Sequence, residues 1–235
     1  MDYVLIDEIF CKKKQIVFSG CGGMLPYYFG IAKYLQENYK LDNIIFGGVS
    51  GGAIISSFLT LDEKIDKIFE IISKDLCEEI QNSKTGALFN MLDILRDYLE
   101  KYYKENYSDD VYKKINNNLF ISVSSIYPKQ ETIIYNWKDN TDLIDCIVAS
   151  CSLPLLGNSL FREYRDAYCL DGCFYNNKPI LYSDLPTLVI TPYKWRYIPP
   201  SWFTIGCNIE WYKELYELGY NDAKKNSSEL DDFFI

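Results

Sequence analysis

Apolar and polar positions at the start of the chain predict a strand that runs into a glycine-rich turn and then a helix. Residues 15–19 read Gln-Ile-Val-Phe-Ser, an apolar run of strand length. Residues 20–23 read Gly-Cys-Gly-Gly. Beyond them, apolar side chains recur at the spacing of one helix face, at Tyr27, Ile31 and Leu35.

The same arrangement occurs a second time. Residues 43–47 form another strand-like run, Gly48-Val49-Ser50-Gly51-Gly52 follows, and the apolar residues 53–59 predict a buried helix. Alternating strands and helices imply an α/β domain with a mainly parallel central sheet covered on both faces.

The rest of the chain continues this alternation and contains no repeat or linker that would mark a second domain. We expect helices where apolar residues recur at helical spacing: Ile65, Ile68, Phe69, Ile72 and Leu76; then Leu88, Met91, Leu92, Leu95, Leu99 and Tyr102. We also expect a short helix over 142–150. We expect strands over 119–123, 132–135, 169–170 and 187–191. The prediction is one domain over 1–235, with its core at about 14–224.

Ser50 lies at the predicted second strand-to-helix turn, where a nucleophilic serine is found in many hydrolases. Gly48, Gly51 and Gly52 allow a sharp turn that exposes the hydroxyl at the start of a helix. The chain has no histidine, so a Ser-His-Asp triad is excluded. The proton of the serine must therefore pass to a carboxylate or a lysine.

Asp171 is the carboxylate that is easiest to place, because it ends an apolar run and Gly172 permits a tight turn after it. The first glycine turn, residues 20–23, offers backbone N–H groups at a helix start, where negative charge is favoured. A nucleotide loop is the competing interpretation. The turn lacks the Gly-Lys-Ser/Thr of a P-loop, and Leu25 stands where a dinucleotide fingerprint needs glycine.

In this order, the motifs resemble the patatin-like phospholipase family, most closely its animal-type branch. The resemblance covers most of the chain: residues 16–22; Tyr27, Gly30, Ile31 and Ala32; Gly48 to Gly52; Ala149 to Pro154; and Asp171-Gly172 with Asn177 and Pro179. Leu215 to Ala223 is similar to the helix that closes many such domains. It implies a patatin-like three-layer α/β/α sandwich.

The resemblance also implies a two-residue mechanism without metal or cofactor. Ser50 would be the nucleophile and Asp171 the general base, with Gly172 in the turn that carries it. The amides of Gly20, Cys21, Gly22 and Gly23 would form the oxyanion hole. Such a dyad needs a direct proton path, so we expect hydrogen-bond distance between Ser50 and Asp171. Three positions depart from the family pattern: Met24 replaces a basic residue, Leu25 a glycine, and Cys173 a small residue.

Net charge and composition limit the partners and the cellular location that we expect for this protein. A net charge of −9 argues against nucleic acid. No run approaches the roughly 20 apolar residues that cross a bilayer, and residues 1–8 do not form a signal peptide. The eight cysteines include no Cys-x-x-Cys pair, which indicates reduced thiols in a cytoplasmic protein: Cys11, Cys21, Cys77, Cys146, Cys151, Cys169, Cys173 and Cys207.

These features together predict a serine lipid acyl hydrolase that cleaves fatty-acyl esters of phospholipids or glycerides. The alternative is a non-hydrolytic lipid-binding or regulatory protein that keeps the patatin-like fold. Residues 193–203 are rich in aromatic side chains, which suits either contact with a membrane or lipid droplet, or packing against the domain.

Overall fold

The computed structural model describes residues 13–84, 89–107, 110–154, 156–206 and 208–235. The expectations for residues 1–8, Cys11, Leu88 and Cys207 lie outside these ranges, as does the side chain of Leu76. Within them, one hydrophobic core cluster extends from Ile16 to Leu230.

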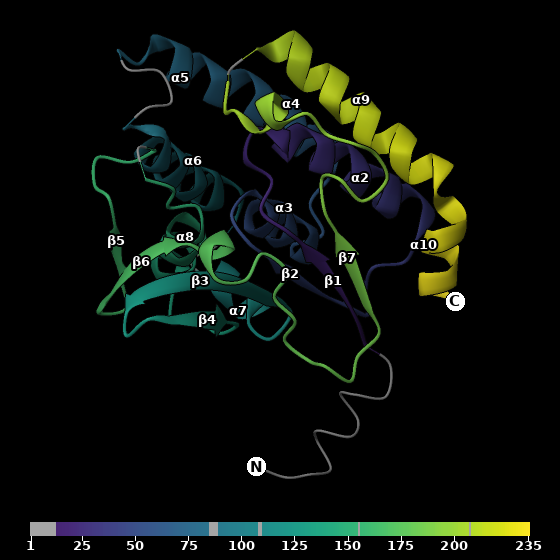
Figure 1. Ribbon diagram of the computed structural model, residues 1–235, viewed down its shortest axis with the longest axis horizontal. Helices are drawn as coiled ribbons and strands as arrows, with labels where there is room; N and C mark the ends of the chain where they lie inside the picture. The colour runs from purple at the N-terminus through teal and green to yellow at the C-terminus, as the bar shows by residue number, and fades with distance from the viewer. Residues whose placement is uncertain (1–12, 85–88, 108–109, 155, 207) are drawn as a thin grey trace.

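A seven-stranded sheet organises the molecule (Figure 1). Its order is β5-β6-β3-β2-β1-β7, and β4 also pairs with β3. The strands are β1 (Lys14–Phe18), β2 (Ile44–Gly48), β3 (Leu119–Tyr127), β4 (Gln130–Ile134), β5 (Arg162–Tyr164), β6 (Ala167–Asp171) and β7 (Thr187–Ile190).

The sheet is mixed rather than mainly parallel, which corrects our expectation. Strands β7, β1, β2 and β3 run parallel, whereas β3–β4, β3–β6 and β5–β6 are antiparallel. The reason is the length of the connections: two residues separate β3 from β4 and two separate β5 from β6. Such short links form hairpins, because a parallel crossover needs a dozen or more residues.

Helices cover the face of the sheet that carries Ile16, Phe18 and Ile121, and α3 and α8 pack directly on the strands. The helices are α2 (Leu25–Asn38), α3 (Gly51–Thr60), α4 (Ile65–Ile71), α5 (Cys77–Asn82), α6 (Met91–Asn106), α7 (Val111–Ile115), α8 (Asn140–Ser150), α9 (Ile209–Lys225) and α10 (Ser227–Phe234). Short turns complete them: η1 (Gly22–Met24), the π-helical η2 (Ile72–Leu76), η3 (Gly172–Phe174) and η4 (Pro200–Phe203).

The opposite face of the sheet has a different cover. Val17, Ile45 and Phe120 pack there against Leu185, together with the neighbouring Leu181 and Tyr182. No helix contributes to this cluster in the described part of the chain. The α/β class is therefore confirmed, and loop residues 181, 182 and 185 contribute to the cover of this face.

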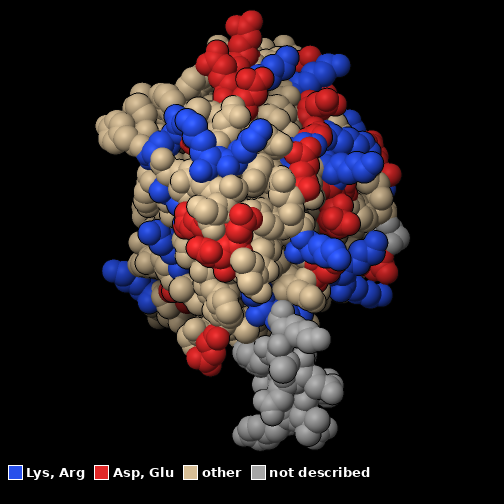
Figure 2. All heavy atoms as spheres, turned by 90° about the vertical axis from the view of Figure 1, so that its right-hand side faces the viewer, with Lys and Arg blue, Asp and Glu red and all other residues tan. Residues whose placement is uncertain are grey.

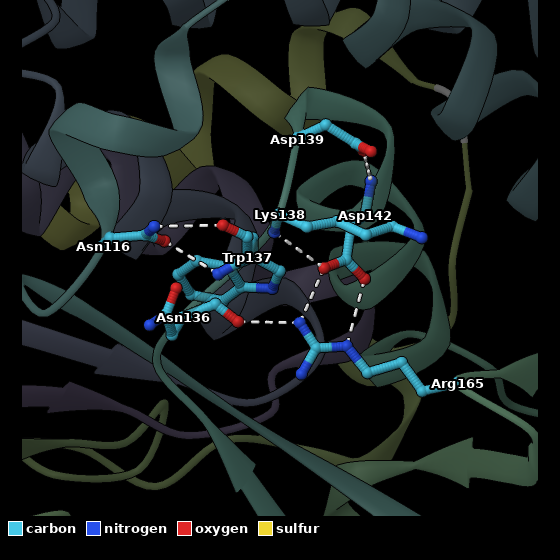
Figure 3. Close-up of polar contacts among 7 residues, drawn as sticks. All are labelled: Asn116, Asn136, Trp137, Lys138, Asp139, Asp142 and Arg165. Atoms are coloured by element: carbon cyan, nitrogen blue, oxygen red, sulfur yellow. Dashed lines mark hydrogen bonds and ion pairs between the residues drawn. The ribbon is translucent and has the colours of Figure 1, made fainter.

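A polar network fixes the start of α8 (Figure 3). Asp139 caps the helix by accepting from the N–H of Asp142 at 2.8 Å. The buried carboxylate of Asp142 in turn accepts two hydrogen bonds from Arg165, in the β5–β6 turn, at 3.1 and 2.6 Å. Arg165 also donates to the carbonyl of Asn136 at 2.7 Å. The helix whose other end reaches the candidate site is thus tied to the edge hairpin.

Acidic and basic side chains are interspersed on the face shown in Figure 2, so the negative charge is not segregated there. Among the described helices, none combines the length and apolarity that a membrane crossing requires.

Candidate functional site

Ser50 stands at the turn between β2 and α3 in a strained backbone conformation. Its φ is 55° and its ψ is −128°, a region that L-residues rarely occupy. The turn is tightly packed, because a Cβ at Gly52 would overlap the carbonyl oxygen of Phe18, and one at Gly48 would overlap Gly52. A Cβ at Gly51 would overlap the Sγ of Cys21. At Gly48 and Gly52 the overlap is with backbone atoms, so the turn requires glycine at these two positions.

The end of α8 supports this turn. Ser150 Oγ accepts from the backbone N–H of Ser50 at 2.9 Å and donates to the carbonyl oxygen of Ser122, in β3, at 2.7 Å. Two residues on, the carbonyl oxygen of Ser152 accepts from the N–H of Asp171 at 2.9 Å. Residues 150–152 therefore hold both the serine turn and the end of β6 in place.

Asp171 is fully buried at the end of β6. Its Oδ1 accepts from the N–H of Cys173 at 2.9 Å, which ties it to the turn that Gly172 begins. Oδ2 has no hydrogen-bond partner among the described residues. Burial raises the pKa of Asp171, and hydrogen bonding from the Cys173 N–H and the Ser50 hydroxyl opposes this rise in part.

Ser50 and Asp171 are therefore neighbours, as the sequence analysis expects. The Ser50 hydroxyl lies close enough to the carboxylate to lower its pKa, while Oδ2 has no hydrogen-bond partner among the described residues. Among the described residues, the groups that shift the pKa of Asp171 include no lysine or arginine. Of the two proton acceptors left open by the sequence, the structure brings the carboxylate to the serine.

Three cysteines surround this pair. Burial raises the pKa of Cys21 and Cys151, and raises that of Cys173 to about 12; the charge of Asp171 adds to each rise. The thiol rather than the thiolate is therefore present at neutral pH. Because the thiolate is the nucleophilic form, these side chains compete poorly with Ser50.

The glycine loop passes beside Ser50, but its four residues are not equivalent. The N–H of Gly20 donates to the side-chain Oδ1 of Asn177 at 2.7 Å, so it is occupied. Gly22 and Gly23 open the η1 turn, and their N–H groups have no hydrogen-bond partner among the described residues. The N–H of Gly51, the residue after the serine, is likewise open, again within the described ranges.

Residues 202–204 pack on the glycine loop from outside. A Cβ at Gly22, whose φ is +50°, would lie 2.7 Å from the carbonyl oxygen of Phe203, and one at Gly23 would overlap that of Thr204. The ring of Trp202 meets that of Trp211 edge-on at 4.8 Å. The aromatic segment thus packs against the domain here, while Tyr193 and Tyr197 are exposed by 51% and 82%.

An apolar cavity of about 70 Å³ opens beside the serine. Ser50, Gly22, Gly23 and Gly51 lie at one end of its wall. The remaining lining is almost wholly apolar: Leu25, Pro26, Phe29, Ile54, Phe69, Ile72, Met91, Leu92, Leu95, Cys151, Leu153, Leu156, Ile205 and Tyr212. Leu25 is part of this wall, and the fully buried Met24 presents no charge. The cavity suits a hydrocarbon chain rather than a polar group.

Two supports of the site have no assigned role in the sequence analysis. Ser150 belongs to a motif recognised only by resemblance, and Asn177 likewise appears there as a motif position. Their contacts span 100 and 157 residues, so no local pattern reveals them. Within the described residues, no group of three or more His, Cys, Asp or Glu side chains is arranged to hold a metal ion.

The fold and this turn define an α/β protein with a serine at a strand-to-helix elbow. The family model "Patatin-like phospholipase" matches residues 16–184, and the chain belongs to that family. Mouse (Mus musculus) 1-acylglycerol-3-phosphate O-acyltransferase Pnpla3 is 24% identical over 77% of this chain and 44% of its own length. Human (Homo sapiens) patatin-like phospholipase domain-containing protein 4 is 26% identical over 79% of this chain and 74% of its own.

Mouse omega-hydroxyceramide transacylase is 24% identical over 70% of this chain and 28% of its own length. The chain thus spans less than half of two of these three relatives. Among solved structures, VipD from Legionella pneumophila aligns over 77% of this chain and 50% of that chain, with 13% identity and a TM-score of 0.46.

Proposed function

We propose that this chain is a serine lipid acyl hydrolase that works as a single domain through Ser50 and Asp171. One observation carries the proposal: a serine in a strained elbow adjoins a buried carboxylate with an unpartnered oxygen and opens onto an apolar cavity. A buried carboxylate oxygen without a hydrogen-bond partner costs folding free energy, which indicates that this oxygen has a functional role. Membership of a family whose model is named for phospholipases supports the same reaction.

In the first half of the reaction, Ser50 Oγ attacks the ester carbonyl carbon and its proton passes to Asp171 Oδ2. The tetrahedral oxyanion accepts hydrogen bonds from the free N–H groups of Gly22, Gly23 and Gly51. The intermediate then collapses, the alcohol leaves with the proton from Asp171, and the acyl group stays on Ser50.

In the second half, water attacks the acyl-serine while Asp171 takes one proton from it. The second intermediate expels Ser50, which regains its proton, and the fatty acid is released. An alcohol in place of water would give acyl transfer, the activity in the names of two relatives. Met24 presents no charge where many relatives have a basic residue, which favours esters without a phosphate beside the reacting bond.

Exposed Tyr193 and Tyr197 support peripheral contact with a membrane or lipid droplet, since tyrosine suits the interface between lipid and water. Among the described cysteines, Cys21, Cys146, Cys151, Cys169 and Cys173 form no disulfide, which supports a cytoplasmic, reducing location.

Labelling with a fluorophosphonate, followed by intact-mass analysis, tests the proposal. The expected result is one adduct on the wild-type chain and on Ser228→Ala, which removes an exposed serine of α10, and none on Ser50→Ala. The wild-type chain and Ser228→Ala should likewise release fatty acid from triglyceride emulsions and phosphatidylcholine vesicles, and Ser50→Ala should release none. A folded wild-type chain that remains unlabelled and inactive would instead favour the non-hydrolytic lipid-binding alternative.

A further inference from the structure

Asn177 lies where the three motifs of the site meet. Its Oδ1 accepts the Gly20 N–H at 2.7 Å. A Cβ at Gly20 would lie 2.9 Å from that oxygen and 3.5 Å from the Cβ atoms of both Ser50 and Cys173. Gly20 is therefore enclosed between the serine turn, the turn after Asp171 and the Asn177 amide.

The glycine loop has few other anchors close to the serine. Gly20, Gly22 and Gly23 carry no side chain, and the buried Cys21 thiol packs on Gly51 and forms a weak contact with the Gly22 carbonyl, at 3.9 Å. Outside the site, Ser19 bonds Tyr28 and residues 202–204 cover the loop. The contact between Asn177 and Gly20 is thus the anchor on the catalytic side.

The segment that carries Asn177 is itself fixed to Asp171. The N–H of Cys173 donates to Asp171 Oδ1, and the N–H groups of Tyr175 and Asn176 donate to the Gly172 carbonyl at 3.3 and 3.2 Å. These contacts set the distance from the carboxylate to the Asn177 amide.

We propose that Asn177 is a positioning residue, which holds the glycine loop by Gly20 so that the N–H groups of Gly22 and Gly23 face the carbon that Ser50 attacks. The inference rests on the proposed function of Ser50 and assigns Asn177 a role within it. By occupying the Gly20 N–H, Asn177 also leaves the oxyanion to the next residues of the loop.

The test compares Asn177→Ala with Asn177→Asp, which keeps an acceptor oxygen, and with Asn176→Ala. Asn176 is the matched control, because it is equally half-buried but bonds Glu131 and the Lys178 N–H. Two readouts are needed: amide hydrogen exchange at Gly20, and the separate kcat and KM for a p-nitrophenyl ester. Thermal melting checks that each variant folds. If Asn177→Ala does not fold, Asn177→Ser takes its place, because the serine hydroxyl is too short to reach Gly20.

In Asn177→Ala, exchange at Gly20 should quicken at least about fivefold, the equivalent of one ordinary hydrogen bond. Its kcat should fall roughly 10- to 100-fold, the effect of a misplaced catalytic group, with KM within about threefold. Asn177→Asp should keep Gly20 protected, and Asn176→Ala should match the wild type in both readouts.

Wild-type exchange at Gly20 in Asn177→Ala, or fast exchange with unchanged kcat, would overturn the proposal. So would a loss of kcat of the same size in Asn176→Ala. If the wild type hydrolyses no ester, the proposed function fails by itself, and the exchange at Gly20 still reports whether Asn177 holds the loop.

Discussion

The backbone N–H of Ser50 donates to Ser150 Oγ at 2.9 Å, across 100 residues of sequence. Since Ser150 also donates to the Ser122 carbonyl at 2.7 Å, the strained serine turn is tied to both α8 and β3. A residue in a rare backbone region persists only when its surroundings hold it there. We therefore treat Ser150 as the support that keeps the hydroxyl of Ser50 in place.

Ser150→Ala should weaken this support. It leaves the Ser50 N–H and the Ser122 carbonyl without their partner, which costs about 1–3 kcal/mol of unfolding free energy. We expect kcat to fall about tenfold or more through misplacement of the nucleophile. Denaturant unfolding and ester kinetics measure the two effects. Ser152→Ala is the control, because that buried hydroxyl donates to the Val148 carbonyl of α8 rather than to the serine turn. Equal loss of kcat in both variants would contradict the role of Ser150.

The sequence predicts most of the elements that position the site, because each depends on local pattern. The runs 15–19 and 43–47, the glycine turns and the helices after them are all observed. The covering of the second face of the sheet by Leu181, Tyr182 and Leu185 is not predicted, since these residues lie outside any periodic segment. The mixed sheet follows from two short hairpin turns: the sequence predicts strands at β3, β4 and β6 but not β5, and the parallel α/β interpretation does not predict their antiparallel pairing.

The residues of the site likewise include some that the local sequence predicts and some whose role depends on contacts between distant segments. Ser50 and Asp171 are recognisable because each follows a strand and adjoins glycine. Occupation of the Gly20 N–H by Asn177 depends on a contact between distant segments, and residue pattern alone does not report it. The absence of an ordinary hydrogen bond to Asp171 Oδ2 is likewise a property of three-dimensional packing.

The raised pKa of Asp171 predicts the pH dependence of hydrolysis. The base must be ionised to accept a proton, so kcat/KM should fall with decreasing pH around a midpoint above the ordinary carboxyl value of 3.8. Asp171→Asn should abolish hydrolysis at every pH. Asp166→Asn is the control, since Asp166 is exposed and its φ of 60° is tolerated by asparagine. A midpoint at or below 3.8 would contradict the role of a buried base.

The same shift predicts an effect on stability. A raised folded pKa means that the folded chain binds the proton more tightly than the unfolded chain, so stability falls as pH rises from the ordinary value through the folded one. At neutral pH the ionised Asp171 is therefore unfavourable for folding. We expect inactive Asp171→Asn to melt at or above the wild-type temperature at pH 7, and a clearly lower melting temperature would count against this account.

Gly23→Ala should disturb the oxyanion side of the site. Its methyl group would overlap the Thr204 carbonyl, so either the glycine loop or residues 202–204 must move. We expect kcat to fall roughly 10- to 100-fold. Gly206→Ala is a matched control, because a Cβ there meets no atom within 4 Å. Comparable kcat values for both alanine variants would show that the loop tolerates displacement.

Arg165→Ala tests the network that anchors α8. Burial by itself raises the pKa of Asp142, but hydrogen bonds from Arg165 and the Lys138 N–H outweigh it and hold the pKa below its ordinary value. The resulting stability is complete above the ordinary carboxyl value and is lost as pH falls through the lower folded one. Removing Arg165 should cost about 1–3 kcal/mol at pH 7 and flatten the acid limb of the stability curve.

Denaturant unfolding between pH 2 and 7 measures this effect, with Arg162→Ala as its control. Arg162 lies on the same hairpin and pairs at 3.5 Å with Asp93, which is half-exposed, so its loss should change the unfolding free energy by less than about 1 kcal/mol. Equal losses in the two variants would mean that the Asp142 pair is no stronger than a surface pair.

Leu95→Trp tests whether the apolar cavity holds the acyl chain. At about 70 Å³ the cavity is far below the roughly 300 Å³ or more of typical small-molecule sites, so a long chain must push its flexible lining apart. An indole on α6 fills that space and stiffens the wall. We expect hydrolysis of long-chain p-nitrophenyl esters to fall at least about tenfold, while the acetate and butyrate esters, which need little of the cavity, change by less than about threefold. Leu160→Trp, at an exposed position outside the lining, controls for the added indole. Equal loss for all chain lengths in a folded Leu95→Trp protein would indicate damage to Ser50 rather than to an acyl site.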